Sequence, residues 1–129
     1  MDYLIDAHAL LWHRNRDTRL SEKARSVLEG NSSGLIVSDV TFWEVSIKLS
    51  IGKLALDGGL ESLRSEWIQK EAAESLSIKW NHIAVLAKLP LIHRDPFDRM
   101  LIAQALEENL TILTCDVNIP QYPGVKSVW

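Results

Sequence analysis

Four acidic side chains stand at positions where they could act together on a metal ion, namely Asp6, Glu44, Asp98 and Asp116. Carboxylates that converge in one crevice repel one another unless a cation holds them. Oxygen ligands suit hard ions such as Mg²⁺ or Mn²⁺. Because such ions keep waters and bind phosphate oxygens, the implied chemistry is hydrolysis of a phosphodiester bond by a metal-activated water.

Asp6 and Asp116 each follow a short run of residues that favour β-strand. The first run, residues 3–5, is apolar and ends at Asp6, and the second, residues 111–114, is rich in β-branched residues and precedes Asp116. If the two strands are parallel, both acids lie at the carboxyl edge of the sheet, where α/β folds bind ligands. The two acids are therefore predicted to share a crevice.

Glu44 and Asp98 lie on two helices that should begin at the same edge. Ser38 can cap a helix that follows the second apolar run, and Glu44 lies about two turns into that helix. Asp98 lies in the first turn of a helix with Asp95 as its N-cap and Pro96 at its first position. The connection before Asp95 must bring this helix start to the crevice.

The whole chain alternates short apolar strands with amphipathic helices. Strands are expected at residues 3–5, 35–37, 76–78, 111–114 and 125–128, helices at about 7–12, 22–29, 39–49, 60–73, 83–89 and 96–108, and a turn at 31–34. This alternation is typical of an α/β domain with a mostly parallel sheet and helices on both faces. With 129 residues, the chain is predicted to form one domain, residues 1–129.

The charge balance, taken alone, argues mildly against nucleic-acid binding. Seventeen acids and fourteen bases give a net charge of −3, whereas proteins that neutralise phosphates usually have a basic excess. An acidic site that binds a polyanion through its metal ion would reconcile the negative net charge with a nucleic-acid substrate.

Cys115 is the only cysteine, which excludes an intrachain disulfide and a cysteine-cluster metal site. No run approaches the roughly 18 apolar residues of a membrane helix and no signal-peptide pattern opens the chain, so a cytoplasmic location without membrane attachment is expected.

Each acid also has a purely structural interpretation. Asp is common in turns after strands, which would account for Asp6 and Asp116. Asp98 could simply favour the helix dipole, and Glu44 could be an exposed acid of its helix. Asp95 is better explained as an N-cap than as a metal ligand. Residue types and spacing leave the structural and the metal-binding interpretations open.

Five segments along the chain resemble, in the same order, those of the PIN-domain ribonucleases and, within them, the VapC-type toxins. The resemblance covers essentially the whole chain, and no single motif decides it. The matching segments are YLIDAHALLW at 3–12, SDVTFWEVSIK at 38–48, IGKL at 51–54, HRDPFDRMLIAQA at 93–105 and LTILTCD at 110–116.

The resemblance implies a three-layer α/β/α sandwich with a metal site. Asp6 and Asp98 match the positions most regularly described as Mg²⁺ ligands. Asp116 matches an acid that binds the metal directly or through water, and Glu44 matches one that binds or orients the site. Thr114 matches a small hydroxyl residue that supports the site from the last catalytic strand.

Several residues near these acids have open roles. Ala7 departs from the family, which usually carries Thr or Ser there, so a hydroxyl that would orient the metal site is missing. Arg99 either steadies the acids or contacts the substrate, and His93 either touches RNA phosphates or stabilises its loop. Cys115 is expected to be a small buried residue rather than a nucleophile.

The resemblance implies an endoribonuclease that uses Mg²⁺, with Mn²⁺ as a possible substitute, and leaves 5′-phosphate and 3′-hydroxyl ends. It also implies a homodimer and a cognate antitoxin protein whose tail fills the acidic groove. Transfer RNA, ribosomal RNA and messenger RNA all stay open as the substrate.

Three alternatives stand beside this interpretation. A housekeeping RNA-processing PIN nuclease would have no antitoxin gene beside it. A catalytically weak PIN domain that only binds a partner stays open because of Ala7, although the intact acids argue against it. A receiver-type signalling module needs paired acids after the first strand and a phosphorylatable Asp after a central one, whereas the chain has a single Asp6 and then Ser38 at these places.

Overall fold

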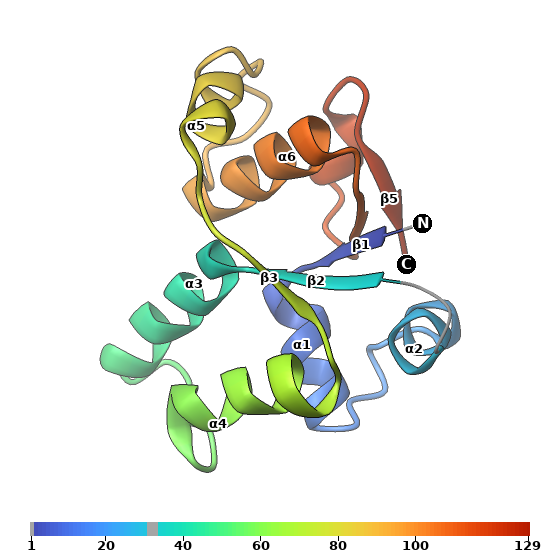
Figure 1. Ribbon diagram of the computed structural model, residues 1–129, viewed down its shortest axis with the longest axis vertical. Coiled ribbons are helices and arrows are strands. Elements are labelled where there is room, and N and C mark those ends of the chain that lie inside the picture. The colour runs from blue at the N-terminus through green and yellow to red at the C-terminus, as the bar shows by residue number, and fades with distance from the viewer. Residues whose placement is uncertain (1, 31–33) are drawn as a thin grey trace.

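A parallel sheet forms the centre of the protein (Figure 1). The computed structural model describes residues 2–30 and 34–129. The strand order is β3-β2-β1-β4-β5, and every neighbouring pair is parallel. The strands are β1 (Asp2–Ile5), β2 (Gly34–Ser38), β3 (Glu74–Leu76), β4 (Thr111–Leu113) and β5 (Lys126–Val128).

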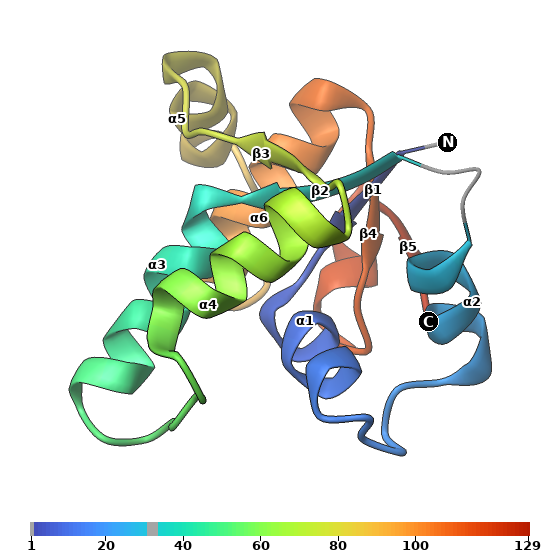
Figure 2. The same ribbon diagram turned by 60° about the horizontal axis from the view of Figure 1, so that its bottom comes forward.

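Helices cover both faces of this sheet, which confirms the predicted three-layer α/β/α sandwich (Figures 1 and 2). On one side lies α6 with α5 packed against it, and on the other lie α1, α2 and α4. The helices are α1 (Ala7–Arg14), α2 (Glu22–Glu29), α3 (Asp39–Ser50), α4 (Gly59–Ser65), the π-helix η1 (Glu66–Lys70), α5 (Trp80–Ala87), α6 (Pro96–Glu108) and the 3₁₀-helix η2 (Ile119–Gln121). In the part of the chain that the structure describes, no helix has the length and apolar character needed to cross a membrane.

Alternating strand residues face two hydrophobic cores, because successive side chains of a strand point to opposite faces. One core contains Leu4, Ile36 and Ile112 with the apolar side of α6, and the other contains Ile5, Val37 and Leu113 with residues of α1, α2, α3 and α4. Burial on both faces explains why the central strands β1, β2 and β4 contain continuous apolar runs, whereas the edge strands β3 and β5 are largely exposed.

The helix that carries Asp98 begins where the sequence predicts. The Oδ1 atom of Asp95 accepts hydrogen bonds from the backbone N–H groups of Phe97, at 2.9 Å, and Asp98, at 3.1 Å. Pro96 occupies the first turn, where its missing N–H costs nothing. The helix ends at Glu108, and the cap residue Asn109 adopts a left-handed conformation with φ 55°.

The chain between residues 60 and 78 departs from the prediction. The helix expected at 60–73 ends at Lys70, and its last turn is a π-helix in which the Glu71 N–H donates to the Glu66 carbonyl at 2.8 Å. Ala72 then adopts a φ of 56°, and β3 begins at Glu74, two residues before the expected strand. Trp67, in this turn, is fully buried in the core. Its packing constrains the backbone of the segment in a way that helix propensity alone does not predict.

Two smaller differences concern element starts. α5 runs over Trp80–Ala87 instead of 83–89, because the His82 side chain caps it by accepting the Lys79 N–H at 3.1 Å. The turn expected at 31–34 falls largely on residues 31–33, outside the described residues, and Gly34 already belongs to β2.

Candidate acidic site

The four predicted acids come from elements that meet at the carboxyl edge of β1 and β4. Asp6 follows β1 directly and Asp116 lies just beyond β4, while Glu44 lies in the second turn of α3 and Asp98 in the first turn of α6. The carboxylates influence one another, since the charge of Glu44 raises the pKa of both Asp6 and Asp98. The tertiary fold therefore brings acids from four separate segments into one electrostatic neighbourhood.

Asp6 is a buried carboxyl with a structural and an electrostatic role. Its side chain caps α1, because Oδ1 accepts the Ala9 N–H at 2.9 Å. Burial raises the pKa of Asp6 above its ordinary value, and hydrogen bonds from Thr114 and Ala9 offset part of that rise. The nearby charge of Glu44 raises the pKa further. A cation bound at this carboxylate would offset both the cost of burying its charge and its repulsion from Glu44.

Asp98 is perturbed more strongly than an ordinary first-turn acid of a helix. Burial, and then the negative charge of Asp95, raises the pKa of Asp98 to about 7, although a hydrogen bond with His93 acts in the opposite direction. The charges of Asp116 and Glu44 add to the rise. Stabilisation by the helix dipole alone would lower this pKa, so the simple dipole interpretation of Asp98 does not account for its surroundings.

Glu44 is turned toward its own helix. Its Oε2 atom lies 3.1 Å from Nζ of Lys48, one turn further along α3, and only 13% of the Glu44 side chain is exposed. This burial argues against the interpretation of Glu44 as an exposed surface acid. The i,i+4 pair supplies the positive charge that partly balances Glu44 when no other cation is present.

Thr114 links the first and the last of the four acids. Its side chain hydrogen-bonds to Asp6 and accepts the Asp116 backbone N–H at 3.1 Å. The Asp116 Oδ1 atom accepts the Asn118 N–H at 2.8 Å. Thr114 is buried just beyond the last residue of β4.

The residues present fit a hard divalent cation by their chemistry, and their arrangement is open. All four side chains offer carboxylate oxygens, which Mg²⁺ and Mn²⁺ prefer. Within residues 2–30 and 34–129, however, no three acidic, histidine or cysteine side chains lie close enough together to enclose an ion. Three of the acids each hydrogen-bond a neighbour on their own element or loop instead, namely Ala9, Lys48 and Asn118.

Arg99 does not contact the acids directly. Its Nη1 atom donates to the Pro90 carbonyl and to the Tyr122 hydroxyl, both at 2.9 Å. Tyr122 is 1% exposed and lies 2.7 Å from Nδ1 of His93, whose Nε2 lies 3.3 Å from Oδ2 of Asp98. Tyr122 was missed in the sequence because an aromatic residue in an irregular segment carries no local sign of a partner 29 residues away.

Cys115 differs from its prediction as a small buried residue, because it is exposed. Desolvation of its sulfur and the charge of Asp6 raise the pKa of the thiol, so the thiolate needed of a nucleophile is disfavoured. Among the tryptophans, Trp67 is a core residue, whereas Trp43 and Trp80 are 56% and 78% exposed.

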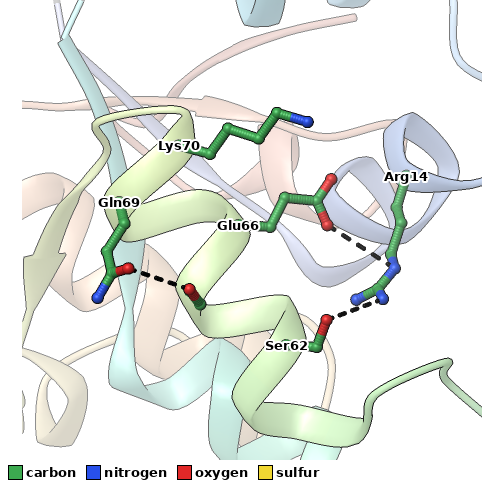
Figure 3. A pocket seen from close by; sticks show the side chains of 6 residues that line it. Arg14, Ser62, Glu66, Gln69 and Lys70 are labelled. Atoms are coloured by element: carbon green, nitrogen blue, oxygen red, sulfur yellow. Dashed lines mark hydrogen bonds and ion pairs between the residues drawn. The ribbon is translucent and has the colours of Figure 1, made fainter.

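A polar hollow of about 640 Å³ lies elsewhere, between the end of α1 and the α4–η1 segment (Figure 3). Two cations line it, Arg14 and Lys70, and Arg14 is engaged by the Ser62 hydroxyl at 3.3 Å and by the Glu66 carboxylate at 3.7 Å. None of the four acids lines this hollow. Part of this hollow is therefore internally paired, although the Nη1 atom of Arg14 is buried without a hydrogen-bond partner among the described residues.

Solved structures with this fold include several toxin–antitoxin complexes. A chain of VapBC2 from Rickettsia felis, solved bound to a DNA fragment from its promoter, superposes with a TM-score of 0.77 at 14% identity, covering 99% of this chain and 98% of that chain. A chain of DNA-bound VapBC from Salmonella typhimurium gives 0.73 at 16% identity, with 99% and 97% covered. A chain of VapBC-5 from Mycobacterium tuberculosis gives 0.62 at 15% identity, with 98% and 97% covered. At these identities the likeness establishes the fold.

Sequence comparison supplies the family. No curated protein sequence matches the chain. The model of the PIN domain, in contrast, matches residues 3–125, which include all four acids and Thr114. The match confirms the resemblance inferred from the five sequence segments. The chain therefore belongs to the PIN-domain family.

Proposed function

We propose that the protein is a Mg²⁺-dependent endoribonuclease that acts as the toxin of a toxin–antitoxin pair. PIN domains are nucleases, and the observation that carries the proposal is the electrostatic coupling of Asp6, Glu44 and Asp98 at one edge of the sheet. Buried carboxylates that raise one another's pKa values are destabilising in a folded protein, and they are commonly retained where they bind a cation or transfer a proton.

Asp6, Asp98 and Asp116 would hold the metal ion, and Glu44 would bind or orient it. When bound, Mg²⁺ supplies an activated water and stabilises negative charge on the phosphate. Thr114 keeps Asp6 and Asp116 in a fixed relation through its hydroxyl. With a pKa of about 7, Asp98 is partly protonated at neutral pH, so it must release a proton before it can act as an anionic ligand.

The proposed partners are an RNA substrate, a second copy of the chain and a cognate antitoxin protein, in the cytoplasm. The shared fold with chains of VapBC complexes supports the antitoxin. Exposed apolar residues support protein partners more generally, because Trp43, Ile47 and Ile51 recur every fourth residue from α3 onward and are 56%, 36% and 58% exposed. Large apolar side chains that remain exposed in a monomer often mark protein interfaces.

The test is cleavage of a labelled mixed RNA pool by the purified, antitoxin-free protein with Mg²⁺, with Mn²⁺ and with EDTA. Asp6→Asn and Asp98→Asn keep side-chain shape and remove the charge, while Glu61→Gln, an exposed acid of α4, is the matched control. We expect metal-dependent cleavage that both aspartate variants lose and the control keeps. Cleavage that persists in both variants would place the chemistry elsewhere.

The open arrangement of the acids keeps a binding-only PIN domain as the second candidate. No three metal-binding side chains in the described part of the chain enclose an ion, and Ala7 lacks a hydroxyl. A folded wild type that binds no Mn²⁺ and cuts no RNA would favour this candidate. A cleaving protein whose gene has no antitoxin gene beside it would instead favour a housekeeping RNA-processing nuclease.

A further inference from the structure

The loop before α6 connects Asp98 to a buried tyrosine through one histidine. His93 Nε2 lies 3.3 Å from Asp98 Oδ2, and His93 Nδ1 lies 2.7 Å from the Tyr122 hydroxyl. The same hydroxyl accepts the His93 backbone N–H at 3.2 Å and an Arg99 N–H at 2.9 Å. The His93 ring is therefore held at both nitrogens and through its own backbone.

Counting protons on the tyrosine determines which ring nitrogen of His93 carries hydrogen. A phenolic oxygen has one proton and two lone pairs. The N–H groups of His93 and Arg99 occupy both lone pairs, so the hydroxyl cannot also accept from Nδ1. The phenolic proton has two acceptors within reach, Nδ1 of His93 at 2.7 Å and the His93 carbonyl at 3.3 Å, and the shorter contact favours donation to Nδ1. With Nδ1 as an acceptor, the hydrogen of the ring lies on Nε2, which faces Oδ2 of Asp98.

We propose that His93 is a positioning residue for the metal site, held by Tyr122 as the Nε2–H tautomer so that it donates to Oδ2 of Asp98. This inference rests on the proposed function and deepens it. Because Nε2 carries a proton, His93 is a donor to the carboxylate and not itself a metal ligand. The hydrogen bond restrains rotation of the Asp98 carboxylate and leaves Oδ1 as the oxygen available to a cation.

The arrangement assigns Arg99 an indirect role in the same chain of contacts. Arg99 binds Tyr122 and the Pro90 carbonyl, so it anchors the tyrosine and the loop. Outer partners of metal-binding carboxylates typically change metal affinity about 10–100-fold when they are removed. A change of metal affinity on this scale indicates a positioning role. A residue that only stabilises the loop would change the stability of the protein without changing the metal affinity of the folded state.

The first test uses the metal-free wild type, so that it does not depend on metal binding. Two-dimensional ¹H–¹⁵N spectra of the histidine rings near pH 7.5 distinguish the two neutral tautomers, and His93→Gln identifies the signal of His93. We expect the Nε2–H tautomer at His93. An Nδ1–H tautomer or a cationic ring would overturn the inference.

The second test compares Mn²⁺ dissociation constants, measured by electron paramagnetic resonance of the free ion. The amide nitrogen of Gln can occupy the place of Nε2, whereas that of Asn reaches only the place of Nδ1. We expect His93→Asn to raise the dissociation constant on the order of 10–100-fold and His93→Gln to restore it to within about threefold of the wild type.

A matched histidine provides the control for destabilisation. His82 is fully buried, and its Nε2 atom lies 2.8 Å from the carboxylate of Glu108. Glu108 is the last residue of α6, so this pair lies roughly 15 Å along the helix from Asp98. His82→Gln should lower the melting temperature and leave Mn²⁺ affinity unchanged. Equal affinity of His93→Asn and the wild type would overturn the positioning role, and failure of His93→Gln to restore affinity would assign His93 as a ligand instead. If the wild type bound no Mn²⁺, the proposed function would fail and the positioning role with it.

Discussion

The raised pKa of Asp98 predicts that the metal-free protein loses stability as the pH rises toward neutrality. In the unfolded chain this carboxyl ionises near 3.8, whereas in the folded protein burial and the charge of Asp95 raise its pKa to about 7. Between these two values the unfolded chain has lost the proton that the folded protein keeps. The folding free energy therefore becomes less favourable as pH rises through this window and changes no further above about 7.

The magnitude follows from the width of the window that is crossed. One pKa unit corresponds to about 1.36 kcal/mol, so ionising Asp98 between pH 5.5 and pH 8 costs at most about 2 kcal/mol. The Asp98 side chain is 18% exposed, and solvent screening at this exposed part reduces the expected loss to about 1–2 kcal/mol. Asp98→Asn cannot ionise and removes this contribution.

The assay is urea unfolding of the metal-free wild type and of Asp98→Asn at pH 5.5 and at pH 8. We expect the wild type to lose about 1–2 kcal/mol more than the variant between the two values, because other titrating groups are common to both proteins. Mg²⁺ at 100 times its dissociation constant should then stabilise the wild type by about 2.7 kcal/mol. Equal losses of unfolding free energy in the two proteins would refute the argument that the folded protein raises the pKa of Asp98.

Three further predictions test the helix start, the core and the lone thiol. Asp95→Asn keeps the capping oxygen but removes a charge that raises the pKa of Asp98, so Mn²⁺ binding should persist to lower pH than in the wild type. Asp95→Ala also removes the cap, so it should lower the free energy of unfolding in urea by about 1 kcal/mol. Trp67→Ala should lower the free energy of unfolding by about 3–5 kcal/mol, because the side chain is fully buried; a loss below 1 kcal/mol would contradict the packing described for η1. Cys115→Ser should leave RNA cleavage unchanged, and a large loss would reveal a role for the thiol that its raised pKa argues against.

Local interactions explain which parts of the fold were predictable from the sequence. The start of α6 depends on Asp95 and Pro96, whose hydrogen bond and fixed φ act within three residues. The central strands β1, β2 and β4 were equally visible, because burial on both faces demands apolar runs, whereas the exposed edge strand β3 begins two residues before the predicted one. The acids at strand ends then followed from the rule that parallel strands bring their carboxyl ends to one edge.

Where predictions failed, the deciding contact lies far away in the chain or the residue lacks a strong local preference. The helix at 60–73 continues well by propensity, yet it ends at Lys70 because Trp67 is fixed in the core. Cys115 is apolar enough to suggest burial, but it falls beyond the last residue of β4, where the chain leaves the sheet.

The sequence by itself determined the order of the elements, the family and the four acids, because these depend on residue type and short-range spacing. Only the tertiary structure decided how each acid is partnered and how strongly it is perturbed. Thr114 meets Asp6 across two neighbouring strands, and Tyr122 meets His93 across 29 residues. Burial and the summed charge of groups from separate segments set a pKa, and neither exists until the chain has folded.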